Sequence, residues 1–64
     1  MRLTKTEKQM VEAIDPWYED GQIVSYQVFL NKGWEFNGED GGSFCEDTMA
    51  EVKETLKRVT RAAQ

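Results

Sequence analysis

The run from Ile23 to Leu30 constrains the fold most, because its side chains alternate with a period of two residues. One face of this predicted strand is uniformly apolar and consists of Val24, Tyr26, Val28 and Leu30. The other face is mixed and consists of Ile23, Ser25, Gln27 and Phe29. An apolar face is stable only when other elements cover it, so we expect helices to pack on the first face and the second to stay half exposed.

The segment before this strand predicts a helix. Thr4 or Thr6 can serve as its N-cap, because each is followed three residues later by a Glu or a Gln, as in a capping box. Helical spacing then brings three apolar side chains onto one face, those of Met10, Val11 and Ile14.

Asp15 and Pro16 interrupt this helix, because the residue before a proline is driven away from helical geometry. With Asp15 as N-cap and Pro16 in the first helical position, a short extra helical turn is predicted through Trp17 and Tyr18. Gly21 is expected to end it.

The C-terminal segment predicts a second helix, capped by Asp47 or Thr48, with Glu51 completing a capping box. A pair of opposite charges at i and i+4, Glu54 and Arg58, supports it. Its apolar stripe has helical spacing and is interpreted as core: Met49, Val52, Leu56, Val59 and Ala63.

Between strand and second helix, residues 31–33 have the composition of a hairpin turn, and residues 34–36 are predicted to return as a second strand. Residues 37–42 are interpreted as a loop, and residues 43–45 as a short third strand. The predicted fold is α+β, a helix, a three-stranded antiparallel sheet and a helix (αβββα), with both helices on one sheet face and a single domain over residues 1–64.

Composition argues against an enzyme. The chain contains no histidine, and Cys45 is its one cysteine, interpreted as a small, half-buried apolar residue. Neither a phosphate-binding glycine loop nor the spacing of a metal site is present, so we expect no catalytic residue, no cofactor and no metal site. No apolar run is long enough to span a bilayer, and no signal peptide precedes the first helix, so a cytoplasmic protein without membrane contact is expected.

Charge is distributed unevenly along the chain. The net charge is −4, but residues 12–47 hold nine carboxylates and one basic residue, Lys32, which is a net −8. The predicted element order is that of double-stranded-RNA-binding domains, in which basic residues at the start of the second helix grip phosphates. Here residues 45–48 carry the opposite charge, so direct nucleic-acid binding is not expected.

The acidic middle has two interpretations. It can simply keep a small protein soluble, or it can steer the chain onto a basic, nucleic-acid-binding surface of a protein, with aromatic side chains as anchors. The residues that we expect to contact a partner are Trp17, Tyr18, Glu19, Asp20, Phe29, Glu35, Glu39, Asp40, Glu46 and Asp47.

In size, charge and predicted element order, and in the segments 15–21 and 38–42, the chain resembles small acidic anti-CRISPR proteins encoded by phages. The resemblance implies an inhibitor that mimics DNA and blocks target recognition by a Cas subunit of a type I surveillance complex in the bacterial cytoplasm. The alternative is a structural or regulatory accessory protein, such as a subunit, antitoxin or adaptor, that binds through an apolar patch containing Phe29. A monomer is favoured, and a homodimer stays open.

Overall fold

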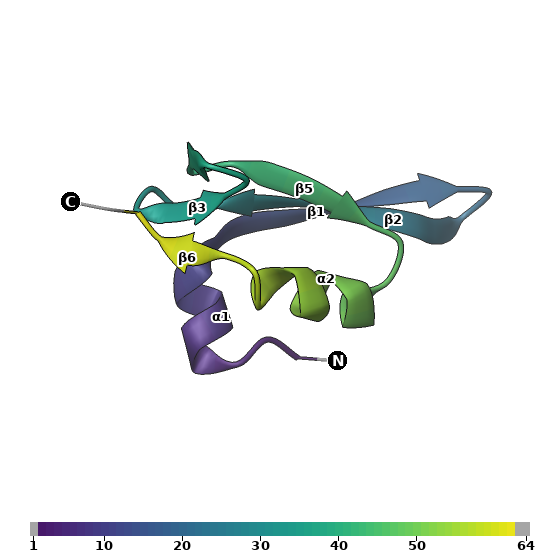
Figure 1. Cartoon of the computed structure of the whole chain (residues 1–64). Coiled ribbons are helices and arrows are strands. Elements are labelled where there is room, and N and C mark those ends of the chain that lie inside the picture. Colours follow the sequence, from purple (N-terminus) through teal and green to yellow (C-terminus); the bar gives the residue numbers. More distant parts are fainter. Residues whose placement is uncertain (1, 63–64) are drawn as a thin grey trace.

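The structure is a computed structural model and describes residues 2–62. Within these residues, two helices and six strands follow one another (Figure 1). In order they are α1 (Lys5–Met10), β1 (Val11–Glu19), β2 (Gln22–Leu30), β3 (Trp34–Phe36), β4 (Glu39–Asp40), β5 (Ser43–Glu46), α2 (Met49–Leu56) and β6 (Thr60–Arg61). None of the helices within residues 2–62 has the length and apolar character needed to cross a membrane.

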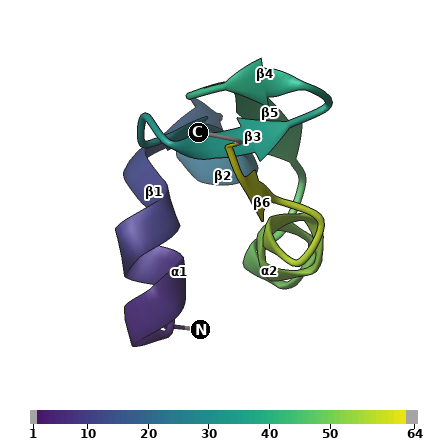
Figure 2. The same cartoon turned by 60° about the vertical axis from the view of Figure 1, so that its left-hand side comes forward.

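The strands form two antiparallel sheets. The first has the order β1-β2-β5 and the second the order β4-β3-β6. Figures 1 and 2 show α1 and α2 on the same side of the strands. The prediction of a small α+β fold with antiparallel strands is confirmed. The prediction of a single three-stranded sheet is wrong, because the chain forms more strands and divides them between two sheets.

The largest correction concerns residues 11–19. They were predicted to continue the first helix and then to form a short helical turn, but α1 ends at Met10 and the chain continues as β1. β1 pairs with β2 from Val11 opposite Leu30 to Glu19 opposite Gln22. Pro16 fits this strand because β1 lies at the edge of its sheet, where a missing backbone N–H is tolerated.

Two Asx-Gly turns close the hairpins. Asp20 and Gly21, between β1 and β2, have φ of 50° and 77°, and Asn37 and Gly38, between β3 and β4, have φ of 53° and 81°. Positive φ at both central residues is what a two-residue type I′ turn requires. Gly21 therefore closes a hairpin instead of ending a helix, and the predicted loop at residues 37–42 contains a turn and β4.

The turn predicted at residues 31–33 does not close a hairpin between its flanking strands. β2 pairs with β1 and β5, whereas β3 pairs with β4 and β6. The backbone N–H of Asn31 donates to the carbonyl of Met10 (2.8 Å), and its side-chain amide donates to the carbonyl of Gln9 (2.9 Å). Asn31 thus joins the end of β2 to the end of α1.

The core lies between the strands and α2. Val28 is fully buried and lies opposite Ile14 on one side and Phe44 on the other. The ring of Phe44 packs against that of Phe36, with centroids 5.2 Å apart. The buried apolar residues are Met10, Val28, Leu30, Phe44, Val52, Leu56 and Val59.

The second helix is confirmed at its start and shorter than predicted at its end. Thr48 is the N-cap and accepts a hydrogen bond from the backbone N–H of Glu51 (3.2 Å). The helix ends at Leu56, so Val59 belongs to the segment between α2 and β6, where it is still buried in the core. Ala63 lies outside the described residues. Glu54 pairs with Lys57 (3.1 Å), three residues away.

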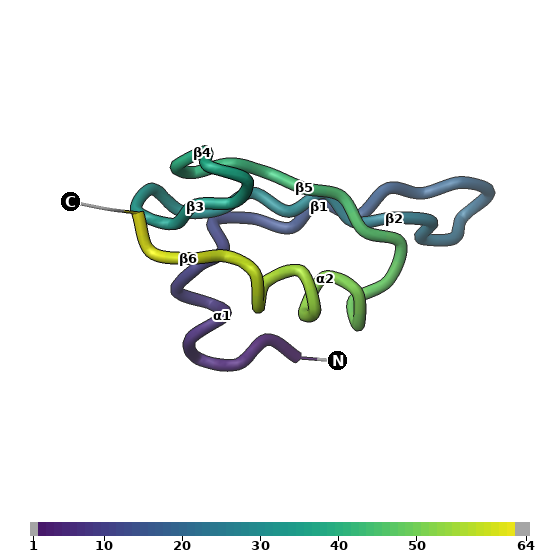
Figure 3. The backbone as a smooth tube through the Cα atoms, in the orientation of Figure 1, coloured from purple at the N-terminus to yellow at the C-terminus, as the bar shows by residue number. Residues whose placement is uncertain are grey.

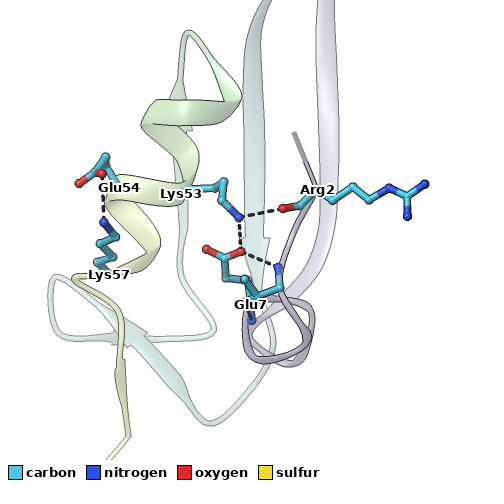
Figure 4. A network of polar contacts seen from close by, with 6 residues as sticks. Arg2, Glu7, Lys53, Glu54 and Lys57 are labelled. Carbon is cyan, nitrogen blue, oxygen red and sulfur yellow. Dashed lines mark hydrogen bonds and ion pairs between the residues drawn. The ribbon is translucent and has the colours of Figure 1, made fainter.

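An ion pair joins the two helices. The Lys53 ammonium lies 2.5 Å from a carboxylate oxygen of Glu7 and donates to the carbonyl of Arg2 (2.8 Å), as Figure 4 shows. Glu7 also completes the capping box of α1 by accepting from the backbone N–H of Thr4 (2.7 Å). Partial burial acts to raise the pKa of Glu7, but the hydrogen bonds from Lys53 and Thr4 and the charge of Lys53 outweigh it and hold this pKa below its ordinary value of 4.5.

Candidate interaction surface

The end of the β1–β2 hairpin extends beyond the rest of the first sheet. β5 pairs with β2 only at residues 26–29, so residues 17–25, which we call the arm, form a two-stranded ribbon. Figures 1 and 3 show the arm projecting from one end of the molecule, whose longest dimension is 44 Å. We call the other described residues, 2–16 and 26–62, the body.

The arm carries an unusual concentration of exposed apolar side chains. Trp17 and Tyr18 are 60% and 62% exposed, and Ile23 and Val24 are 42% and 41% exposed. Phe29, at 38%, is exposed on the adjoining part of β2. Single exposed apolar residues are ordinary, but a contiguous group of them marks an interaction site.

Strand register places Trp17 and Phe29 on one open face. Trp17 pairs with Ser25, Asp15 with Gln27 and Ala13 with Phe29, and paired residues share a face. Val28 and Ile14 belong to the opposite face, which meets the core. Trp17 and Phe29 therefore lie on the face turned away from the helices, as the strand pattern predicted for Phe29.

The open face also contains Cys45 of β5, which lies opposite Gln27 of β2. Its thiol is exposed and donates to the side-chain carbonyl of Gln27 (2.7 Å). The prediction that Cys45 is half buried is wrong, because alternation in β5 buries its neighbour Phe44 and turns Cys45 outward. Within residues 2–62, no three Cys, Asp or Glu side chains are placed so that together they could hold a metal ion.

The charge of the hairpin is entirely negative. Residues 9–31 contain four carboxylates, Glu12, Asp15, Glu19 and Asp20, and no Lys or Arg. Glu19 and Asp20 are exposed at the end of the arm, directly beside Trp17 and Tyr18. The four predicted contact residues 17–20 thus lie together, and they combine anionic and aromatic groups.

The remaining predicted contact residues are placed elsewhere. Glu35, Glu39 and Asp40 belong to the second sheet, at the end of the molecule away from the arm (Figures 1 and 3). Asp40 accepts a hydrogen bond from the backbone N–H of Gly33 (2.6 Å). The acidic middle of the sequence therefore separates into an acidic arm and a second acidic group.

Glu46 and Asp47 lie between these two groups, where β5 leads into α2. Glu46 lies opposite Tyr26, and its carboxylate accepts a hydrogen bond from the hydroxyl of the buried Thr55. This contact turns Glu46 towards α2 and gives it a structural role, whereas Asp47 is exposed.

A cleft of about 310 Å³ lies at the end of the body away from the arm, between α1, β3 and the end of α2. It is lined by Thr4, Thr6, Glu7, Met10, Trp34, Leu56, Lys57 and Val59. The guanidinium carbon of Arg61 lies 4.9 Å from the ring centroid of Trp34, in a cation–π contact at this end of the body. Sequence reasoning missed the cleft, because its walls come from segments far apart in the chain and only the tertiary fold brings them together.

Comparison with protein-family models, with curated proteins and with solved structures found no match to this chain.

Proposed function

We propose that this chain is a non-enzymatic protein-binding module and that the arm is its contact surface. The observation that carries this proposal is the exposure of Trp17 and Tyr18, which are 60% and 62% exposed at the end of a projecting hairpin. Aromatic side chains supply much of the energy of protein interfaces, because each buries a large area at little entropic cost.

The charge of the arm defines the partner further. Glu19 and Asp20 flank the aromatic residues, and the whole hairpin lacks a basic residue. Such a surface accelerates association with a basic surface and repels acidic ones. The partner that fits is a protein with a basic surface and an apolar depression that can receive Trp17 or Tyr18.

Nucleic-acid-binding faces of proteins are basic and often bear apolar or aromatic side chains. A specific form of the proposed function is therefore inhibition by occlusion, as the resemblance to anti-CRISPR proteins implies, with Glu19 and Asp20 in place of phosphates. Because Glu39 and Asp40 lie away from the arm, the proposed inhibition by occlusion involves contact through the hairpin alone.

The first experiment is capture of partners by the tagged chain from bacterial lysate that contains type I surveillance complexes, followed by mass spectrometry. The arm variant is Trp17→Thr/Tyr18→Thr, which removes both aromatic rings and introduces β-branched residues that also favour a strand. The matched control is Glu39→Lys, a change at an exposed residue of the other sheet. The proposal expects a basic protein that the unchanged chain and the control retain and the arm variant loses.

Salt separates the contributions of charge and apolar contact. Charge steering weakens when salt is raised, because the Debye length falls from about 10 Å at 0.1 M to about 3 Å at 1 M. Retention that is insensitive to salt and to Glu19→Lys would favour the alternative, an accessory protein that binds through Phe29 and the open sheet face. Equal retention by the arm variant and the unchanged chain would contradict the proposal.

Occlusion has its own assay, which uses purified surveillance complex and labelled target DNA. Pre-incubation with the chain should reduce DNA binding, and the arm variant should have lost this effect. Undiminished DNA binding at saturating amounts of the chain would exclude inhibition of that complex and leave the binding module as the function to be tested.

A further inference from the structure

The body offers a surface that is complementary to the arm. Seven of the eight basic residues lie in α1, α2 and β6 or within three residues of them, namely Arg2, Lys5, Lys8, Lys53, Lys57, Arg58 and Arg61. The cleft lies among these elements. The arm is thus acidic and aromatic, whereas the cleft has Lys57 in its wall and Arg61 stacked on its Trp34. The carboxylates Glu35, Glu39 and Asp40 belong to the second sheet at the same end of the molecule.

The walls of the cleft favour an apolar guest beside an anion. Met10, Leu56 and Val59 are buried core residues that contribute apolar wall, and half-buried Trp34 adds an aromatic surface. Lys57 is 70% exposed, so its contact with Glu54 is loose and its ammonium is available to another carboxylate. The one acidic residue of the lining, Glu7, is already paired with Lys53.

The size of the cleft also limits what it can hold. Its volume of about 310 Å³ is at the lower limit of pockets for drug-sized ligands, which span roughly 300–1,000 Å³. An open depression of this size suits one or two large side chains of a protein better than a whole small molecule. The arm presents such side chains, Trp17 and Tyr18, directly beside Glu19 and Asp20.

We propose that the cleft is a docking site for the arm of a second copy of this chain. The inference rests on the proposed function, because it takes the arm as the binding element. Tyr18 or Trp17 enters the cleft against Trp34 and Leu56, and Glu19 and Asp20 approach Lys57 and Arg61. The arm cannot fill its own cleft, because the elements that line the cleft, α1, β3 and the end of α2, lie at the end of the molecule opposite the arm (Figures 1 and 3).

Charge selects this head-to-tail contact over a symmetric one. Two hairpins placed face to face would bring together two surfaces of four carboxylates each, without a basic residue between them. An arm in a cleft places opposite charges together instead. Because the two contacting patches differ, each docked copy leaves one free arm and one free cleft, so the assembly grows with concentration.

Sedimentation velocity over a range of concentrations at low salt tests the proposal. The unchanged chain is expected to exceed the mass of a monomer, 7.4 kDa, and then that of a dimer. The arm variant Trp17→Thr/Tyr18→Thr and the cleft variant Lys57→Glu/Arg61→Glu should each associate at least about tenfold more weakly. Glu39→Lys should behave as the unchanged chain does.

A mixture of the arm variant and the cleft variant provides the decisive measurement. The mixture contains intact clefts on one variant and intact arms on the other, so it should form a 1:1 dimer and grow no further. A second cleft variant, Thr6→Phe, which fills the cleft without changing charge, should give the same result. Circular dichroism confirms that each variant is folded before it is mixed.

Two outcomes would overturn the inference: an unchanged chain that stays monomeric at the highest concentration, or a mixture that fails to dimerise while the unchanged chain associates. Neither would affect the proposed function, which is read from the capture of a basic protein by the arm. Conversely, capture that is insensitive to the arm variant would contradict the proposed function, whatever the state of self-association.

Discussion

The two ends of β2 have similar side chains and opposite environments. Val28 and Leu30 are 0% and 2% exposed, whereas Ile23 and Val24, in the same strand, are 42% and 41% exposed. The difference comes from the neighbours, because β5 and α2 cover the second half of β2 and end before its first half. Apolar character alone therefore does not identify a core residue, and the uncovered half of this strand is available for binding.

The largest difference between body and arm is expected in the free energy of unfolding when a substitution leaves a cavity in the core. Leu30→Ala should cost about 2–5 kcal/mol of the free energy of unfolding, because it leaves a void among packed side chains. A domain of this size has only about 3–5 kcal/mol to lose, so much of the variant should be unfolded at 25 °C. Urea unfolding followed by circular dichroism measures this loss.

The same measurement on Trp17→Thr should show a change within about 0.5 kcal/mol, because the side chain is exposed. A loss comparable to that of Leu30→Ala would mean that Trp17 is packed in the folded protein, and the arm would no longer be a free surface.

A smaller effect distinguishes the two glycine turns. Gly21 and Gly38 have φ of 77° and 81°, and a non-glycine residue in this region costs about 1–2 kcal/mol. Gly38→Ala should lower the free energy of unfolding by about that much, because its turn joins β3 to β4 in the body. Gly21→Ala should mainly loosen the arm, with a smaller change in global stability.

Urea unfolding and amide hydrogen exchange measure the global and the local effects of these variants. Equal losses of global stability in both would show that the arm unfolds together with the body.

The ion pair between the helices should have a still smaller effect, which depends on pH. The pKa of Glu7 is lower in the folded protein than its ordinary value of 4.5, so its stabilising contribution is present above that value and is lost as pH falls through the folded pKa. Glu7→Gln keeps the capping box and removes the charge, at a cost of about 1 kcal/mol or less at pH 7.

Unfolding midpoints of the unchanged chain and of Glu7→Gln, compared between pH 7 and pH 3, test this. The two midpoints should differ at neutral pH and converge at acidic pH. A difference that persists at the lowest pH would mean that Glu7 acts through packing instead of charge.

An effect as small as that of Trp17→Thr is expected for Glu54→Gln. Both members of its pair with Lys57 are 70% exposed, so the change in the free energy of unfolding should lie within about 0.5 kcal/mol. Its urea midpoint should match that of the unchanged chain, and a clear loss would assign this pair a role in ending α2.

Sequence reasoning succeeded where a local signal and the final environment agreed. The alternation of residues 23–30 predicted β2, and Thr48 predicted the start of α2. It failed at residues 11–19, because Met10, Val11 and Ile14 have helical spacing, while pairing with β2 is a long-range interaction that outweighs it. The Asp20-Gly21 and Asn37-Gly38 dipeptides are typical of hairpin turns. They were the local signals that could have corrected the predicted helix at residues 11–19 and the predicted loop at residues 37–42.

The candidate site was predictable in part. Trp17 and Tyr18 were among the predicted contact residues, and both are exposed, although they lie in a strand and not in the predicted helical turn. The division of the acidic residues between two ends was not predictable, because it depends on how the two sheets are arranged. The role of Glu46 in binding Thr55 likewise depends on the tertiary contact between β5 and α2.

Amide hydrogen exchange on the free chain and on its complex with the captured partner tests the central claim most directly. In the free chain, the amides of residues 17–25 should exchange faster than those of residues 26–30, which have neighbours on both sides. In the complex, the largest gain in protection should fall on residues 17–25. Protection that is confined to residues 34–40 or to α2, with the arm unchanged, would contradict the account.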